Sequence, residues 1–253
     1  MLKVNSISIG YGDRTLVRDI SFELAPGELV LLAGPNGTGK TTLLKRLSSG
    51  GIGPRNLRSL CDLRPSHKWA PPSNVPRVAQ VRGPIPPEDN LILIPTNIPK
   101  VKGFTVEGFI ETGCYRESDW RGRISAEAKE RMEKALELLG IQEFKERDIT
   151  TLSDGEFQKA CLAVGLTRQA EVLLLDEPTA HLDVENRIDV LRTLREVARR
   201  TGTAILFSSH DLHDALQVTD RVFVITRSGK FIASDSDHQK DVLKEAFPNL
   251  DIL

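Results

Sequence analysis

The segment from Gly34 to Thr41 has the residue types and spacing needed to hold phosphate groups. It fits the pattern G-x-x-x-x-G-K-[ST] and consists of Gly34, Pro35, Asn36, Gly37, Thr38, Gly39, Lys40 and Thr41. Its glycines let backbone N–H groups turn inward around phosphate oxygens. Lys40 supplies an ammonium group for the β- and γ-phosphates, and the Thr41 hydroxyl is placed to bind Mg²⁺. Together with the adjacent Thr42, the segment predicts a nucleoside triphosphate site rather than a simple glycine turn.

A pair of acidic residues follows a short apolar run farther along the chain. Asp176 and Glu177 come directly after residues 172–175, whose all-apolar sequence predicts a buried strand of a parallel sheet. Ligands bind at the carboxyl edge of such sheets. Asp176 fits the role of holding Mg²⁺, and Glu177 fits a general base that orients or deprotonates water. A solvated strand end is the alternative, which the phosphate loop makes less favourable.

A histidine is predicted to lie at the same edge of the sheet. His210 follows the predicted strand at residues 203–208, so it also projects from a carboxyl end. A single histidine at a strand end is usually structural, but three converging strand ends favour contact with the γ-phosphate. Lys40, Glu177 and His210 are therefore the predicted catalytic residues. His213 is predicted to be an exposed helical residue.

Strands and helices alternate along most of the chain. Two antiparallel strands are predicted at residues 4–9 and 16–24. Further strands are predicted at residues 28–33, 91–94, 172–175, 204–207 and 221–225, with helices at 41–47 and 184–200, after Asp211, and at the C-terminal end. This order predicts an α/β fold with a P-loop NTPase core, a mainly parallel sheet and an N-terminal antiparallel β-subdomain.

A different pattern occupies the middle of the chain. Helical periodicity at residues 105–112, 125–139 and 153–169 predicts an inserted helical subdomain over about 97–169. Residues 50–90 are rich in Gly, Pro, Ser and Arg, and they predict an irregular segment of unknown role. We expect residues 1–253 to form a single domain that contains both insertions.

The composition argues against several classes of protein. The 34 basic and 35 acidic side chains nearly cancel, which gives no reason to expect direct nucleic-acid binding. Cys61, Cys114 and Cys161 are too few and too far apart for a disulfide framework or a zinc knuckle. The sequence has no signal-peptide pattern and no run of about 18 apolar residues. We therefore expect a cytoplasmic protein that needs a partner for any role at a membrane.

The order of these motifs resembles the ATP-binding cassette (ABC) family of transporter ATPases over nearly the whole chain. Residues 152–156 read Leu-Ser-Asp-Gly-Glu, where the family has LSGGQ. In that family the segment begins a helix that caps the γ-phosphate bound by the opposite subunit. The resemblance implies this role for Ser153 and Gly155. On local sequence alone, Ser153 to Glu156 is simply a capping box.

Asp154 and Glu156 depart from the family pattern. They replace a glycine and a glutamine, and the negative charge of Asp154 opposes an anion at the helix start. These departures leave open a degenerate binding module that has lost hydrolysis. The argument against it is the intact set Lys40, Thr41, Asp176, Glu177 and His210.

Other positions take their expected roles from the resemblance. Tyr11 matches the aromatic residue that stacks on adenine, although it could also be an ordinary turn tyrosine. Asp183 resembles the segment that couples the two nucleotide sites across the dimer. Because the chain has one cassette, the family mechanism implies two chains, either as a homodimer or with a related subunit.

The family's glutamine, which contacts Mg²⁺ and senses the membrane partner, has no clear counterpart. Gln80 has a conventional spacing from Lys40 but lies in poor strand sequence, whereas Thr96 and Asn97 follow the better strand at residues 91–94. We favour Asn97 or Thr96, and Asn97 joins Thr41 and Asp176 as a predicted metal ligand.

Within the family, residues 113–116, Trp120 and residues 182–187 are most similar to subunits that energise uptake of iron chelates, haem or cobalamin. The resemblance implies ATP and Mg²⁺ as cofactors. It also implies permease partners, a solute-binding protein in the case of an importer, and a peripheral position on the cytoplasmic face of the membrane. The permease is expected to dock around residues 96–117. An exporter subunit, or a soluble cassette ATPase without a transport role, remains the alternative.

Overall fold

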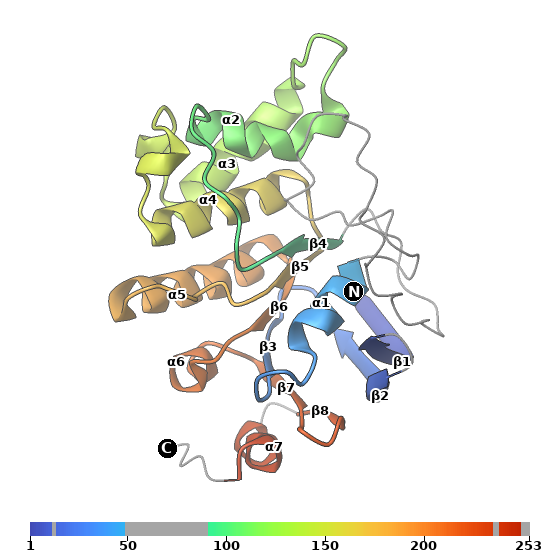
Figure 1. Cartoon of the computed structure of the whole chain (residues 1–253). Helices are drawn as coiled ribbons and strands as arrows, with labels where there is room; N and C mark the ends of the chain where they lie inside the picture. The colour runs from blue at the N-terminus through green and yellow to red at the C-terminus, as the bar shows by residue number, and fades with distance from the viewer. Residues whose placement is uncertain (12–13, 49–90, 235–237, 249–253) are drawn as a thin grey trace.

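A six-stranded sheet with helices on both faces forms the centre of the protein (Figure 1). The computed structural model describes residues 1–11, 14–48, 91–234 and 238–248. The strand order is β4-β5-β6-β3-β7-β8. Every pair in this sheet is parallel except β7 and β8. The predicted α/β fold with a mainly parallel sheet is therefore confirmed.

The strands of this sheet form from short, mainly apolar runs, and all of them except β8 are buried along most of their length. They are β3 (Leu29–Ala33), β4 (Leu91–Ile94), β5 (Val172–Leu175), β6 (Ala204–Ser208), β7 (Arg221–Ile225) and β8 (Phe231–Ala233). Successive side chains alternate between the faces, so Leu173 and Leu175 join one apolar cluster while Val172 and Leu174 join the other. Burial on both faces explains why β3, β4 and β5 contain only apolar residues.

The N-terminal sheet covers one face of the central sheet together with α1. It consists of β1 (Leu2–Tyr11) and β2 (Arg14–Leu24), which pair antiparallel as predicted. Fully buried side chains of this sheet, among them Ile7 and Ile20, pack in one cluster with Leu43 of α1 (Lys40–Ser48). This packing fixes the helix that begins inside the phosphate loop.

Helices cover the other face and extend beyond the β4 end of the sheet (Figure 1). They are α2 (Val106–Glu111), α3 (Ala126–Leu139), α4 (Asp154–Thr167), α5 (Val184–Thr201), α6 (Leu212–Leu216) and α7 (Gln239–Ala246). Three short 3₁₀ helices lie among them at η3 (Thr112–Glu117), η4 (Gln142–Phe144) and η5 (Ile149–Thr151). The regular structure within residues 97–169 is thus mainly helical, as expected for the predicted helical subdomain, and its role as a separate unit stays a prediction.

Two features differ from the sequence prediction or lie beyond it. Strand β8 was not predicted, because its three residues are too few to show a pattern and their burial is only partial. The predicted irregular segment at 50–90, with Gln80 and Cys61, lies outside the described residues. Within the described ranges, no helix is both long enough and apolar enough to cross a membrane.

Candidate functional site

The phosphate loop connects the end of β3 to the start of α1. Gly34, Gly37 and Gly39 have backbone φ angles of 153°, 78° and 108°, which residues other than glycine rarely adopt. A Cβ at Gly34 would lie 2.4 Å from the Ile225 carbonyl oxygen at the end of β7. At Gly37 a Cβ would meet nothing within 4 Å. The loop is therefore packed against the sheet at one end and open at its tip.

Lys40 reaches back into this loop from the first turn of α1. Its Nζ donates hydrogen bonds to the carbonyl oxygens of Gly34 at 2.8 Å and Pro35 at 3.3 Å. Burial lowers the pKa of Lys40, and the nearby carboxylates of Glu177 and Asp176 partly oppose this shift. A buried ammonium that is held by neutral carbonyls favours an incoming anion. The predicted loop residues are thus assembled around the Lys40 ammonium, and their binding of phosphate stays a prediction.

Asp176 links three elements at the carboxyl edge of the sheet. Its Oδ1 accepts hydrogen bonds from the hydroxyls of Thr41 and Ser208, each at 3.0 Å. Leu175 pairs with Phe207 in the parallel register of β5 and β6, so Asp176 and Ser208 are the next residues of the two strands. Only 6% of Asp176 is exposed. Two of the predicted Mg²⁺ ligands, Thr41 and Asp176, therefore lie in direct contact.

Glu177 and His210 meet beside this group. The Glu177 Oε1 and His210 Nε2 atoms are 2.7 Å apart. Glu177 has a φ of 51°, in the left-handed region that is costly for a residue with a Cβ. Its backbone N–H donates to the Ser208 hydroxyl at 2.9 Å, which supports this conformation. The structure brings together the two side chains predicted to act on water and on the γ-phosphate.

The residues that follow β4 also reach the acidic pair. The Thr96 hydroxyl donates to the Asp176 carbonyl oxygen at 2.8 Å. Asn97 is exposed, and both Thr96 and Asn97 line a cavity of about 370 Å³ together with Glu177 and Asp154. Thr96 thus braces the backbone at Asp176, a predicted metal ligand. Asn97 as a metal ligand stays a prediction.

The start of α4 lies across that cavity. The Ser153 hydroxyl accepts the Glu156 N–H at 3.2 Å, and the Glu156 Oε2 accepts the Ser153 N–H at 2.7 Å. This is the capping box that the local sequence indicates. Ser153 and Gly155 are therefore part of a well-formed helix start, and their contact with a phosphate of another subunit stays a prediction.

The remaining predicted residues occupy defined backbone positions. Asp183 caps α5, because its Oδ1 accepts the Asn186 N–H at 2.8 Å. Thr42 lies half-buried in the first turn of α1. Tyr11 ends β1, and its side chain lies outside the described part of the structure. His213 is exposed, as predicted.

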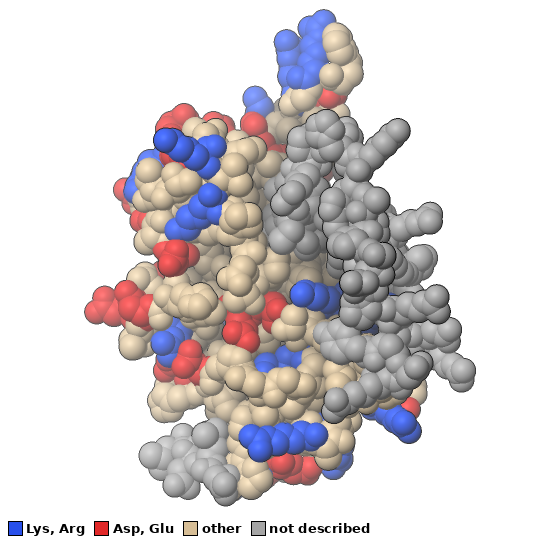
Figure 2. All heavy atoms as spheres, viewed as in Figure 1, with Lys and Arg blue, Asp and Glu red and all other residues tan. Residues whose placement is uncertain are grey.

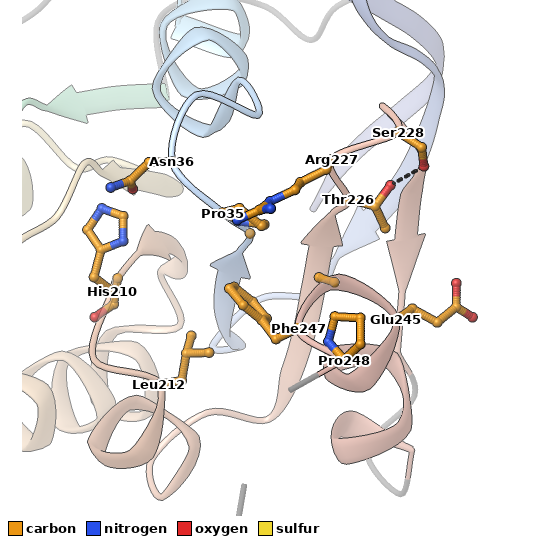
Figure 3. A pocket seen from close by; sticks show the side chains of 13 residues that line it. Pro35, Asn36, His210, Leu212, Thr226, Arg227, Ser228, Glu245, Phe247 and Pro248 are labelled. Atoms are coloured by element: carbon orange, nitrogen blue, oxygen red, sulfur yellow. Dashed lines mark hydrogen bonds between the residues drawn. The ribbon is translucent and has the colours of Figure 1, made fainter. Parts of the chain in front are cut away.

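A second, larger cavity borders the phosphate loop at Gly34, Pro35 and Asn36. It has a volume of about 800 Å³, and its lining includes Asn36, His210, Arg227 and Phe247. His210 points toward Asn36 of the loop at one side of this cavity (Figure 3). Lys and Arg are interspersed with Asp and Glu on the face shown in Figure 2, which agrees with the net charge of −1.

Sequence reasoning missed functional contacts made by three residues. Ser208 bonds both Asp176 and Glu177, Thr96 bonds the Asp176 backbone, and Lys100 contacts the start of α4. A signal existed for Ser208, because residues that end adjacent parallel strands must be neighbours. Lys100 gave no such signal, because it lies outside any helix or strand and its contact partner Asp154 is 54 positions away in α4.

Comparison with known proteins identifies relatives for most of the chain. The profile of the ABC transporter family matches residues 17–180. The iron(3+)-hydroxamate import ATP-binding protein FhuC of Bacillus subtilis is 31% identical over 249 residues, which cover 97% of this chain and 87% of the relative. The zinc import ATP-binding protein ZnuC of Cereibacter sphaeroides is 33% identical over 227 residues, which cover 90% of this chain and 79% of the relative.

A solved structure has a similar fold. It is a nucleotide-free ATP-binding cassette from an ABC transporter, with a TM-score of 0.70 and 19% identity, and the alignment covers 100% of this chain and 96% of that one. At this identity the similarity concerns the fold alone.

Proposed function

We propose that this chain, which belongs to the ABC transporter family of ATP-hydrolysing proteins, energises the import of a metal chelate through membrane permease subunits. The observation that carries the proposal is the convergence of Lys40, Asp176 and Glu177 on one sheet edge, where Ser208 holds both acids. Such an edge suits metal-assisted phosphoryl transfer.

The donor set at this edge fits Mg²⁺. Thr41 offers a hydroxyl and Asp176 a carboxylate, and hard oxygen ligands of this kind suit Mg²⁺, which usually binds few protein groups together with phosphates and water. Among the described residues, no group of three or more His, Cys, Asp and Glu forms an alternative metal site. The bound ion would neutralise charge on the phosphates.

We assign the chemistry to the residues around it. Lys40 exchanges its contacts with the loop carbonyls for the β- and γ-phosphate oxygens of ATP. Glu177 takes a proton from a water whose oxygen attacks the γ-phosphorus, while the bond from that phosphorus to the ADP oxygen breaks. His210 orients Glu177 through their 2.7 Å contact and reaches the γ-phosphate from the same edge. Asp176 and Thr41 would hold the metal ion.

We infer that the site is completed by a second cassette subunit, most simply another copy of this chain. Ser153 and Gly155 at the start of α4 would then face the γ-phosphate held by the other copy, and Asp183 would couple the two sites. Tyr11 would stack on the adenine, and Thr42 would support the phosphates. The exposed start of α4, at Ser153 and Asp154, is compatible with this arrangement.

The relatives guide the choice of import and of solute. FhuC is named for iron(3+)-hydroxamate import and ZnuC for zinc import, so both are named for metal uptake. We propose an iron chelate, with a haem or cobalamin-type solute as the related possibility. The surface around residues 96–117 would receive the permease, placing the chain peripherally at the cytoplasmic face of the membrane. A solute-binding protein would complete the importer.

The decisive experiment replaces Glu177 with Gln. E177Q should lower the kcat for ATP hydrolysis by more than about 100-fold and yield an ATP-bound dimer in light scattering, while ADP leaves a monomer. His213→Ala is the matched control, because among the described residues this exposed side chain makes a single hydrogen bond, with Gln217 at 3.3 Å. Normal hydrolysis by E177Q would show that Glu177 is not the base.

Co-purification then tests the transport role. Expression with its neighbouring genes should recover a many-helix permease and an exported solute-binding protein. Recovery of a permease without a binding protein would favour an exporter. Hydrolysis at full rate without any membrane partner would favour a soluble cassette ATPase.

A further inference from the structure

Asp154 places a negative charge at the helix start that the proposed function assigns to a phosphate. It lies in the first turn of α4, and 64% of its side chain is exposed. A carboxylate at this position competes with an incoming phosphate for the positive end of the helix dipole and repels it through like charge. Without compensation, this end of α4 is poorly suited to a second subunit's ATP.

Glu156 does not add to this problem in the same way. Its carboxylate is turned back onto the Ser153 N–H at 2.7 Å, so it closes the capping box. Among the described residues, no acceptor bonds the N–H groups of Asp154 and Gly155, which lie in the first turn. The Ser153 hydroxyl accepts one hydrogen bond and can still donate its proton. Donors for an anion are therefore available.

Lys100 supplies a compensating charge from another part of the chain. Its Nζ lies 2.8 Å from the Asp154 Oδ1 and 2.8 Å from the Leu152 carbonyl oxygen. The ammonium also lies 5.3 Å from the centre of the Phe157 ring, and only 24% of the Lys100 side chain is exposed. Three contacts thus fix the ammonium at the start of α4, rather than leaving it free in solvent.

We propose that Lys100 is a positioning residue that neutralises Asp154, so that the start of α4 can accept the γ-phosphate of ATP bound to a second copy of the chain. The inference rests on the proposed function, because it assumes that α4 faces this phosphate. It explains how the departure at Asp154 is compatible with an active cassette. Lys100 also follows β4, so the pair connects the proposed permease-facing segment to α4.

A double-mutant cycle on Lys100 and Asp154 tests the inference in the E177Q background. The variants are Lys100→Met, Asp154→Asn and the double variant, and methionine retains the aliphatic contact with Phe157. The readout is the ATP concentration that gives half-maximal dimer formation in light scattering. Because both partners are partly solvated, effects of about two- to fivefold are expected. K100M should raise this concentration, D154N should lower it, and the double variant should return near the parent value.

Two further readouts separate positioning from folding. In the wild-type background, K100M should raise the KM for ATP about two- to fivefold and leave kcat nearly unchanged, whereas Lys100→Arg should keep the KM near that of wild type. The differences should shrink as ionic strength rises. Lys100→Gln replaces K100M if the latter lowers the melting temperature.

The inference would be wrong if K100M changed the half-maximal ATP concentration equally in chains with Asp154 and in chains with D154N. Lys100 would then act independently of Asp154, for example through Leu152. An unchanged half-maximal concentration in K100M would overturn it as well. The parent E177Q chain shows whether the proposed function itself fails. If this parent does not dimerise with ATP, the proposed function fails, and the inference fails with it.

Discussion

The N-termini of α1 and α4 are both proposed to face phosphate, yet they are built in different ways. The start of α1 has no acidic residue in its first turn, and the Lys40 side chain is buried inside a loop whose glycines have positive φ angles. The start of α4 has Asp154 and Glu156 in its first turn and is exposed at Ser153. Backbone geometry therefore shapes the first site, whereas side-chain pairs shape the second.

This difference predicts unequal tolerance to substitution. A backbone cradle fails when one residue blocks its shape or removes its central charge, because nothing else can replace that group. A site made of exposed charge pairs changes in small steps, since water screens each pair. Substitutions at α1 should therefore affect hydrolysis strongly, and substitutions at α4 should shift nucleotide concentrations modestly.

The largest effect is expected from Lys40→Ala. Its ammonium is the buried cation of the loop and bonds the Gly34 and Pro35 carbonyl oxygens. We expect kcat to fall by more than about 100-fold, measured by phosphate release at saturating ATP. Lys45→Ala is the matched control, because this exposed lysine lies in the last turn of the same helix. If K40A left kcat nearly unchanged, as is expected of K100M, the proposed contrast between the two helix starts would be wrong.

Gly34→Ala tests the role of backbone shape. The added Cβ would lie 2.4 Å from the Ile225 carbonyl oxygen, so β7 or the loop must move. We expect nucleotide affinity to weaken by at least about tenfold, measured by equilibrium binding of a fluorescent ATP analogue. Gly37→Ala is the control, because its φ of 78° adds strain but its Cβ meets nothing within 4 Å. Equal losses in both variants would assign the effect to φ strain alone.

Ser208→Ala should have an intermediate effect. It removes the hydroxyl that donates to Asp176 and accepts the Glu177 N–H, so a buried carboxylate and a partly buried N–H lose a partner. We expect a cost of about 1–3 kcal/mol in unfolding free energy and a fall in kcat of about tenfold, as Glu177 loses its support. Urea unfolding and steady-state kinetics measure the two effects. Ser209→Ala should cost less, because among the residues that the structure describes the Ser209 hydroxyl makes one hydrogen bond, in which it accepts the Asp211 N–H.

The contrast between the two helix starts also explains how far the sequence could be interpreted. The glycines, Lys40 and Thr41 form a local pattern because one short segment must build the whole cradle. The parallel strands could be predicted as well, since burial on both faces demands continuous apolar runs such as Val172 to Leu175. Asp176, Glu177 and His210 followed from the rule that such strands end at one edge.

Long-range pairing limited the rest. From the sequence, Asp154 is an unfavourable negative charge at a helix start. Its pairing with Lys100 could not be predicted, because Lys100 is 54 positions away and belongs to a segment without regular structure. Thr96 and Asn97 could not be separated from sequence, because their difference depends on which side chain turns toward the Asp176 backbone. Contacts of this kind depend on packing between elements, which local patterns do not encode.

The smallest effect is expected at the capping box of α4, where Glu156→Ala should change stability and nucleotide binding in opposite directions. Removing its carboxylate frees the Ser153 N–H and costs about 0.5–1 kcal/mol of unfolding free energy. The freed N–H and the lost negative charge both favour an anion, so the KM for ATP should stay constant or fall by up to about twofold. Ser125→Ala at the start of α3 is the control, because it removes a similar cap that is not proposed to face phosphate. If KM rose for E156A and not for the control, the hydrogen bonds of the capping box, rather than the charge of Glu156, would prepare α4 for phosphate. Backbone geometry would then shape the start of α4 as it shapes the start of α1.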